Sequence, residues 1–281
     1  MSKERYYAEL LRGCAEVAHA PAPSPGVREL FGLESFSEAE HTEIFVLELA
    51  PEASIYLTPG AHLGGEPLDR LEGFYRALGV NDVRDPMSLS SQLAFLASLI
   101  DGFAEGDHEP AKLAALDRVR SAFLFEHLLV WVPVYASVAA RLAPALAPWS
   151  EALLEVLEVQ FDQLSLGEWN WSPAVFGTRL GAADAAELSL AELLISPYLS
   201  GFVLTRKLLF SKAPQYGLAP RIGTRRFIVS SMLDQDPVAT VALIRDEASA
   251  QLDSWRQLSS RFGKPLASWA EVCASSIDSM S

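Results

Sequence analysis

The side chains best suited to chemistry in this chain are five histidines and one basic cluster. His19, His41, His62, His108 and His127 are scattered, and none has a His, Cys or carboxylate partner at a recognised metal-binding spacing. Glu126 and His127 are neighbours, but neighbours on a helix point about 100° apart and cannot readily serve one substrate atom. The glycine motifs of phosphate-binding loops, dinucleotide sites and nucleophile elbows are absent from the sequence. We therefore expect no catalytic residues and no metal site.

The basic cluster consists of Arg206, Lys207, Lys212, Arg221, Arg225 and Arg226. The last three lie in "RIGTRR", where a glycine would let the backbone approach a ligand and arginines could bind phosphate in bidentate fashion. This pattern predicts a site for a nucleotide or a pterin phosphate. The alternative is a solvated face whose arginines pair with acids of neighbouring helices, and we favour this alternative.

Composition restricts the class of partner. The chain has 281 residues, half of them hydrophobic, and a formal net charge of −14, so it would repel nucleic acids and anionic membranes. No apolar run is long enough to cross a bilayer, and the opening "MSKERYYAELLRGCAEV" lacks the apolar region of a signal peptide. We expect a cytoplasmic protein in which Cys14 and Cys273 are buried thiols.

The spacing of apolar residues predicts helices along nearly the whole chain. Leu68, Leu71, Tyr75 and Leu78 share one helix face within residues 65–79, between an early proline and Gly79. Further helices are expected over 86–106, from Pro110 onward, over 149–164, after Ser196-Pro197, after Asp236-Pro237 and over the last segment from 264. Only "TEIFVLEL" (42–49) fits a buried helix and a strand equally well. The fold class is therefore all-α, a multi-helix bundle.

Two segments interrupt the helical pattern. "FLFEHLLVWVPVYASVA" (123–139) is almost wholly apolar but contains Pro133, which removes a backbone donor and clashes with the preceding turn. We expect the helix to kink or restart near Val132. Residues 167–187 lose the periodicity and contain Gly, Pro, Asn and Ser, which predicts a connector.

Aromatic residues gather in the first half of the chain. Tyr56, Phe74, Tyr75, Trp131 and Tyr135 are of the types favoured in peptide-binding grooves, because they bury much area at little entropic cost. Aromatic side chains at helical spacing are more often part of a core, and we give that interpretation the greater weight.

These residues carry a resemblance to a known family. "FLFEHLLVWVPVYASVA" resembles the pattern F-x-x-x-H-L-x-x-W-x-P-x-F/Y of redox-enzyme maturation chaperones of the TorD/DmsD/NarJ type, filled here by Phe123, His127, Leu128, Trp131, Pro133 and Tyr135. Upstream, Ser54, Tyr56 and Leu57 resemble the S-x-Y-L segment of this family. Gly65, Phe74, Tyr75 and Gly79 match its glycine-bounded helix. The resemblance covers residues 40 to 165 well, and the region after 190 is similar to an extension of one family branch.

One motif of the family is incomplete. At the place of the E-P-x-D-H hinge the chain has "DPMSL", in which Asp85 and Pro86 fit. Met87 and Ser88 stand where Asp and His belong. Either the partner differs, or the hinge needs only its backbone shape.

The resemblance implies a TorD-like helical core over residues 1–166 and a C-terminal helical extension over 188–281 packed on it. It implies a cytoplasmic monomer or homodimer without catalysis. The partner would be the apo catalytic subunit of a molybdenum-cofactor oxidoreductase, or its twin-arginine signal peptide, held until the cofactor is inserted. No cofactor would be bound permanently, and a guanine nucleotide or molybdopterin dinucleotide would be a transient ligand. Arg221, Arg225 and Arg226 are the candidate phosphate ligands, inferred from the basic cluster and not from the resemblance.

The partner-binding residues implied in this way are Tyr56, Phe74, Tyr75, Asp85, Pro86, His127, Trp131 and Tyr135. In this interpretation Pro133 shapes a groove wall and Trp131 packs there. For His127 and Trp131 we favour a structural role over direct contact. A helical small-molecule binder and a non-catalytic scaffold subunit are the alternatives.

Overall fold

The computed structural model describes residues 2–104, 109–164 and 188–281. Within these ranges the chain is built from helices, and the β-structure consists of an isolated bridge between Glu52 and Ser88. The predicted all-α fold class is thereby confirmed. The predicted connector over 167–187 lies outside the described residues.

The chain divides into two compact units. Unit 1 comprises Met1–Ala53 and Leu68–Ser172, and unit 2 comprises Ser54–Pro67 and Pro173–Ser281. The sequence motifs alone would assign Ser54–Pro67 to the N-terminal core, whereas the structure groups this segment with the C-terminal region.

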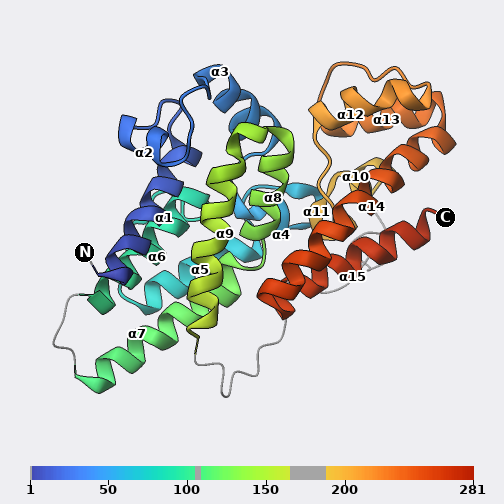
Figure 1. The fold of residues 1–281 in the computed structure, drawn as a ribbon. Coiled ribbons are helices and arrows are strands. Elements are labelled where there is room, and N and C mark those ends of the chain that lie inside the picture. Colours follow the sequence, from blue (N-terminus) through green and yellow to red (C-terminus); the bar gives the residue numbers. More distant parts are fainter. Residues whose placement is uncertain (1, 105–108, 165–187) are drawn as a thin grey trace. The chain divides into compact units, whose positions relative to one another are not determined.

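Unit 1 is a bundle in which α1 packs against α6 and α9, α6 against α7, and α8 against α9 (Figure 1). A buried hydrogen bond also connects α9 to α1: the indole N–H of Trp149 donates to the Cys14 carbonyl at 3.1 Å. The helices of this part are α1 (Lys3–His19), α2 (Pro25–Leu30), α3 (Glu38–His41), η1 (Thr42–Glu48), α5 (Glu66–Ala77), α6 (Leu89–Ala104), α7 (Pro110–Phe123), η3 (Leu124–Leu128), α8 (Val132–Leu142), η4 (Pro144–Leu146) and α9 (Ala147–Asp162). The ambiguous segment 42–49 is thus helical, with π-type hydrogen bonding in η1.

The predicted break before Pro133 is present. α7 continues into the π-helix η3, a turn follows, and α8 starts at Val132 with Pro133 in its first turn. A proline is tolerated there because the first N–H groups of a helix have no intrahelical acceptor. The helices on either side of the break are inclined by 50°.

Unit 2 centres on the pair α14 and α15, which lie side by side (Figure 1). The rings of Trp255 and Trp269 meet between them at 6.2 Å. The helices of this part are α4 (Ala53–Leu57), η2 (Pro59–Ala61), α10 (Leu190–Ile195), α11 (Pro197–Ser200), α12 (Arg206–Lys212), η7 (Ala213–Tyr216), α13 (Arg225–Gln235), α14 (Pro237–Phe262) and α15 (Lys264–Ser279). Asp236 caps α14 as predicted, since its carboxylate accepts from the Ala239 N–H at 2.9 Å.

The helix expected after Ser196-Pro197 is much shorter than the sequence suggests. α11 ends at Ser200 because Gly201 adopts φ +71°, a left-handed conformation that favours glycine. A Cβ at Gly201 would lie 2.4 Å from the backbone nitrogen of Cys273 in α15. The Trp255 indole also donates to the Gly201 carbonyl at 2.9 Å. Close approach of two backbones, which apolar spacing does not reveal, therefore ends this helix.

Cys14 and Cys273 are both free and buried, as expected. Among the described helices, none is by itself long and apolar enough to cross a membrane; the bent pair Pro110–Leu128 and Val132–Leu142 meets that criterion only when the two are taken together.

We expect Gly201→Ala to lower the free energy of unfolding of unit 2 by about 3 kcal/mol, because the new Cβ collides with α15 and occupies a left-handed backbone. Gly217→Ala is the matched control. Gly217 has the same φ of +71°, but no described atom lies within 4 Å of the place that its Cβ would take, so only the backbone penalty of about 1 kcal/mol applies. Urea denaturation of the full chain measures both, and equal losses would contradict the steric explanation.

Candidate functional site

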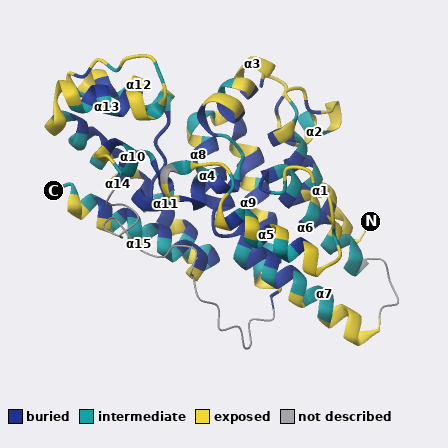
Figure 2. Cartoon of the chain, turned by 180° about the vertical axis from the view of Figure 1, so that it is seen from behind, coloured by how far each residue is buried: buried dark blue, intermediate teal, exposed yellow. Residues whose placement is uncertain are grey.

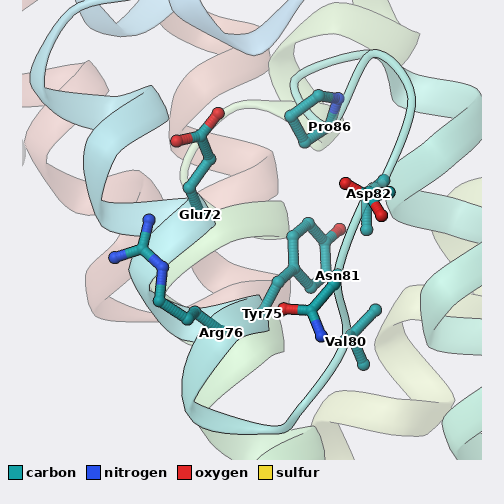
Figure 3. A pocket seen from close by; sticks show the side chains of 8 residues that line it. Glu72, Tyr75, Arg76, Val80, Asn81, Asp82 and Pro86 are labelled. Carbon is teal, nitrogen blue, oxygen red and sulfur yellow. The ribbon is translucent and has the colours of Figure 1, made fainter.

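A pocket of about 390 Å³ opens in unit 1 between α5 and the loop that follows it. It is lined by Glu72, Tyr75, Arg76, Val80, Asn81, Asp82, Val83 and Pro86. Figure 3 shows Tyr75 between the helix and the loop, with Glu72 and Arg76 on the helix side. Two of the predicted site residues, Tyr75 and Pro86, therefore meet at one cavity.

The polar end of Tyr75 is unusual for a buried phenol. The side chain is only 2% exposed, and its hydroxyl has no hydrogen-bond partner among the described residues. Burial raises the pKa of this phenol well above its usual value, so it stays a neutral donor at physiological pH. A buried unpaired hydroxyl is unfavourable by about 1–3 kcal/mol unless a ligand or a water satisfies it.

The loop that closes the pocket is held in an unfavourable backbone conformation. Asp82 and Asp85 have φ values of +59° and +48°, which non-glycine residues adopt infrequently. Such conformations persist only where surrounding contacts impose them, and they are frequent at binding sites.

Backbone pairing holds the end of this loop. The Ala53 N–H donates to the Met87 carbonyl at 2.9 Å, and the Leu89 N–H donates to the Pro51 carbonyl at 2.8 Å. Ser88 caps α6, because its hydroxyl oxygen accepts from the Ser91 N–H at 3.2 Å. Met87 is buried. Met87 and Ser88 stand where the motif has Asp and His. Here they contribute backbone bonds, a cap and burial to the end of the loop, which we call the hinge after the motif that it resembles.

Gln92 of α6 links this hinge to the core. It is 1% exposed, and its amide oxygen accepts from the indole N–H of Trp131 at 3.2 Å. Its amide nitrogen donates to the carbonyls of Pro86 and Met87, at 3.4 Å each. One side chain therefore joins the break before α8 to the loop that lines the pocket.

A carboxylate beside the hinge has altered acidity. Burial, and then repulsion from Asp85, raise the pKa of Glu52 to about 7. Near neutral pH Glu52 is therefore partly protonated, and an approaching cation would favour its ionised form.

Phe74 and His127, both predicted site residues, belong to an aromatic cluster next to the pocket. The rings of Phe74 and His127 are 5.2 Å apart, and Phe123 lies 5.6 Å from His127. Phe95 packs edge-on against Tyr75 at 4.8 Å. His127 is buried, its Nε2 has no partner among the described residues, and burial followed by the charge of Arg70 lowers its pKa to about 4. It is therefore neutral at physiological pH.

Trp131 and Tyr135 are fully buried. The Trp131 indole donates to the His127 carbonyl at 3.0 Å as well as to Gln92, and the Tyr135 hydroxyl donates to the Leu49 carbonyl at 3.2 Å. These contacts give both side chains a role in the core of unit 1. Tyr56 is also buried but belongs to unit 2. The structure thus groups Phe74, Tyr75, Pro86 and His127 around one place, and Asp85 lies in the same loop.

The predicted phosphate ligands make other contacts. Arg225 donates to the Leu204 carbonyl at 3.2 Å, and Arg226 pairs with Glu192 at 2.8 Å. Arg221 is exposed in the loop before α13. Lys212 pairs with the fully buried Glu247 at 2.5 Å.

Among the described residues no group of three or more His, Cys, Asp or Glu could hold a metal ion.

The net charge of the chain resides in unit 1. This unit has 11 Lys and Arg against 25 Asp and Glu, whereas unit 2 has 11 of each. The pocket therefore lies in a unit with a net charge of −14, which would attract a cationic ligand.

Sequence reasoning did not identify Glu72, Arg76, Asn81, Asp82 or Gln92. Glu72 and Arg76 lie one turn apart on α5, beside the Tyr75 that the motif marks, so helix periodicity could have located them. Nothing in the sequence signals that the loop folds back over this helix face.

We expect the free energy of unfolding to fall as the pH drops from about 6.5 to about 4, because the unfolded state protonates His127 and the folded state does not. At pH 4.5 the effect of this residue is about 2.5 kcal/mol. Chemical denaturation at pH 7 and 4.5 measures it, with His127→Gln as the comparison because other groups also titrate. Identical pH dependence in the two proteins would contradict a buried neutral His127.

We expect Trp131→Ala to lower the free energy of unfolding by about 3–5 kcal/mol, since it removes a fully buried indole and leaves the Gln92 amide oxygen without that donor. Thermal and urea denaturation measure the loss. A loss under about 1 kcal/mol together with weakened peptide binding would instead indicate that the Trp131 ring lies on the partner-binding surface.

Known proteins match the central part of this chain. Residues 34–137 match the family model described as "Nitrate reductase delta subunit". The "Chaperone protein TorD" of Vibrio cholerae serotype O1 is 32% identical over 123 residues, which cover 38% of this chain and 55% of that protein. The chain thus spans about half the length of the curated relative it matches, and no solved structure matches it. These matches confirm the resemblance inferred from the motifs: over residues 34–137 the chain is similar to proteins of the TorD-like family.

Proposed function

We propose that this protein is a cytoplasmic maturation chaperone without catalytic activity of its own. It binds the apo catalytic subunit of a molybdenum-cofactor oxidoreductase, or the twin-arginine signal peptide of that subunit, until the cofactor is inserted. The relative from Vibrio cholerae is named a chaperone protein, which supports this class of function. The observation that carries the proposal is the pocket in the strongly acidic unit 1, lined by Tyr75, whose buried hydroxyl has no partner among the described residues.

The pocket offers the groups that a cationic peptide segment needs. Glu72 and Asp82 supply carboxylates, with which a guanidinium forms charge-assisted hydrogen bonds. Val80, Val83 and Pro86 supply apolar walls. The Tyr75 hydroxyl is buried, so a peptide carbonyl would accept from it only after the pocket lining shifts; that bond would remove the penalty of its present unpaired state. A volume of about 390 Å³ is at the small end for a ligand site, so the pocket would hold a short segment of a longer partner.

The hinge beside the pocket can respond to such a partner. An arginine placed near Glu52 and Asp85 would lower the pKa of Glu52, so binding would release a proton near neutral pH. Gln92 of α6 is hydrogen-bonded to the loop. A shift of the loop on partner binding would therefore be transmitted to the core through Gln92.

A phosphate ligand at Arg221, Arg225 and Arg226 is less well supported. Arg225 and Arg226 already contact a carbonyl and a carboxylate, and the described lining of the pocket includes none of the three.

The test uses a fluorescein-labelled peptide with two adjacent arginines followed by an apolar segment, titrated with the full chain and followed by anisotropy. Tyr75→Phe should weaken binding roughly fivefold to tenfold while leaving stability equal or higher, because it removes an unpaired buried hydroxyl. Glu72→Lys should weaken binding by about tenfold or more through charge reversal.

Glu155→Lys is the charge-matched control, because Glu155 is an exposed residue of α9 in the same unit and does not line the pocket. It should reduce affinity much less than Glu72→Lys. A peptide in which both arginines are replaced by alanine should bind weakly to every variant. Absence of binding by the wild-type chain, or equal effects of the two lysine variants, would refute the assignment of this pocket.

A further inference from the structure

A basic and apolar surface lies on unit 2, outside the site proposed above. Residues 206–226 contain six Lys and Arg and no Asp or Glu, although the chain as a whole carries −14. Ile222 is 90% exposed in this segment, Phe210 is 37% exposed, and the adjoining Phe227 is 47% exposed. We call Phe210, Arg221, Ile222, Arg226 and Phe227 the basic surface. Figure 2 shows much of the connection between α12 and α13 as exposed.

The basic surface is held in a defined shape. The Gln235 side chain pairs with both backbone groups of Ala219, accepting from its N–H and donating to its carbonyl at 3.0 Å each. Thr224 caps α13 by accepting from the Phe227 N–H at 3.3 Å. Ile222 lies between these two anchors, so little conformational entropy is lost when a partner covers it.

An acidic and apolar surface of the opposite kind lies on unit 1. Residues 34–52 contain six Glu and no Lys or Arg. Val46 and Leu47, in the π-helix η1, are 62% and 54% exposed. We call Glu34, Glu38, Glu40, Val46 and Leu47 the acidic surface. α3, which carries Glu38 and Glu40, leads directly into η1, and Figure 2 shows it largely exposed.

We propose that the basic surface of one copy of this chain docks on the acidic surface of a second copy. Each surface has exposed apolar side chains among charges that are mostly of one sign, and the two signs are opposite. The exceptions are Glu192, which pairs with Arg226, and Arg28, which donates to the Glu34 carbonyl. Burial of Ile222 against Val46 and Leu47 would remove apolar area from water, and the flanking charges would set the orientation. Every copy of the chain carries both surfaces, so a second copy supplies an acidic surface that complements the basic one.

Two properties follow from this arrangement. The contact joins unlike surfaces, so it is heterologous, and a pair retains one unused surface of each kind on which further copies can add. The surfaces are small and charged, so the contact is weak, with a dissociation constant roughly in the range of 10–500 µM at physiological salt, and it weakens as salt rises.

The test is sedimentation velocity of the full chain at concentrations up to about 500 µM, at low and high salt. The wild-type chain should show concentration-dependent association that high salt reduces. Ile222→Asp and Leu47→Lys should each sediment as monomers. Val238→Asp is the control, since Val238 is 79% exposed on α14 of unit 2 and belongs to neither surface. It should associate like the wild type.

Mixing the two interface variants gives the decisive result. Ile222→Asp keeps the acidic surface and Leu47→Lys keeps the basic surface, so the mixture should form pairs that stop at two copies. Far-ultraviolet circular dichroism of each variant establishes that it is folded. A monomeric wild type, loss of association in Val238→Asp, or a mixture without pairs would overturn the proposal.

Discussion

The buried amide of Gln92 is the constraint on which the arrangement of unit 1 depends. A side chain that is 1% exposed must have both ends of its amide satisfied, and here the partners come from distant segments. Its oxygen accepts from Trp131 at the break before α8, and its nitrogen donates to the Pro86 and Met87 carbonyls in the hinge loop. The position of the core break and the position of the pocket loop are therefore coupled through one residue.

The pocket and the hinge share a second feature: both contain buried polar or acidic groups whose hydrogen-bonding or charge requirements the described residues do not meet. The Tyr75 hydroxyl and the His127 Nε2 are buried without partners in this part of the chain, and Glu52 is pushed toward its neutral form by burial and by Asp85. Asp82 and Asp85 add backbone strain in the same loop. A region that lowers its free energy when a donor, acceptor or cation arrives is suited to binding.

Unit 2 follows a different principle, in which close backbone approach replaces side-chain packing at the key contact. Gly201 lets α11 end against α15, and Gln251 pairs with the Val203 backbone at 2.8 and 2.9 Å to fix the chain that leads to α12. The buried Glu247 is neutralised by Lys212 and accepts from Gln251 at 2.8 Å. These contacts fix the backbone that leads into α12. They therefore hold the basic side chains of α12 and of the following loop in place.

The sequence by itself determined the helical class, the restart at Val132, the starts of α7 and α14, and the resemblance to the TorD-like family, because each depends on local periodicity, on proline chemistry or on a spaced motif. It also pointed to Phe74, Tyr75, Pro86 and His127, which the structure brings to one place. Only the tertiary structure decided that Trp131 and Tyr135 face the core, that Glu72 and Asp82 share a cavity with Tyr75, and that α11 stops at Gly201. These outcomes depend on which segments distant in the chain come into contact, and the apolar period of one helix carries no information about its neighbours.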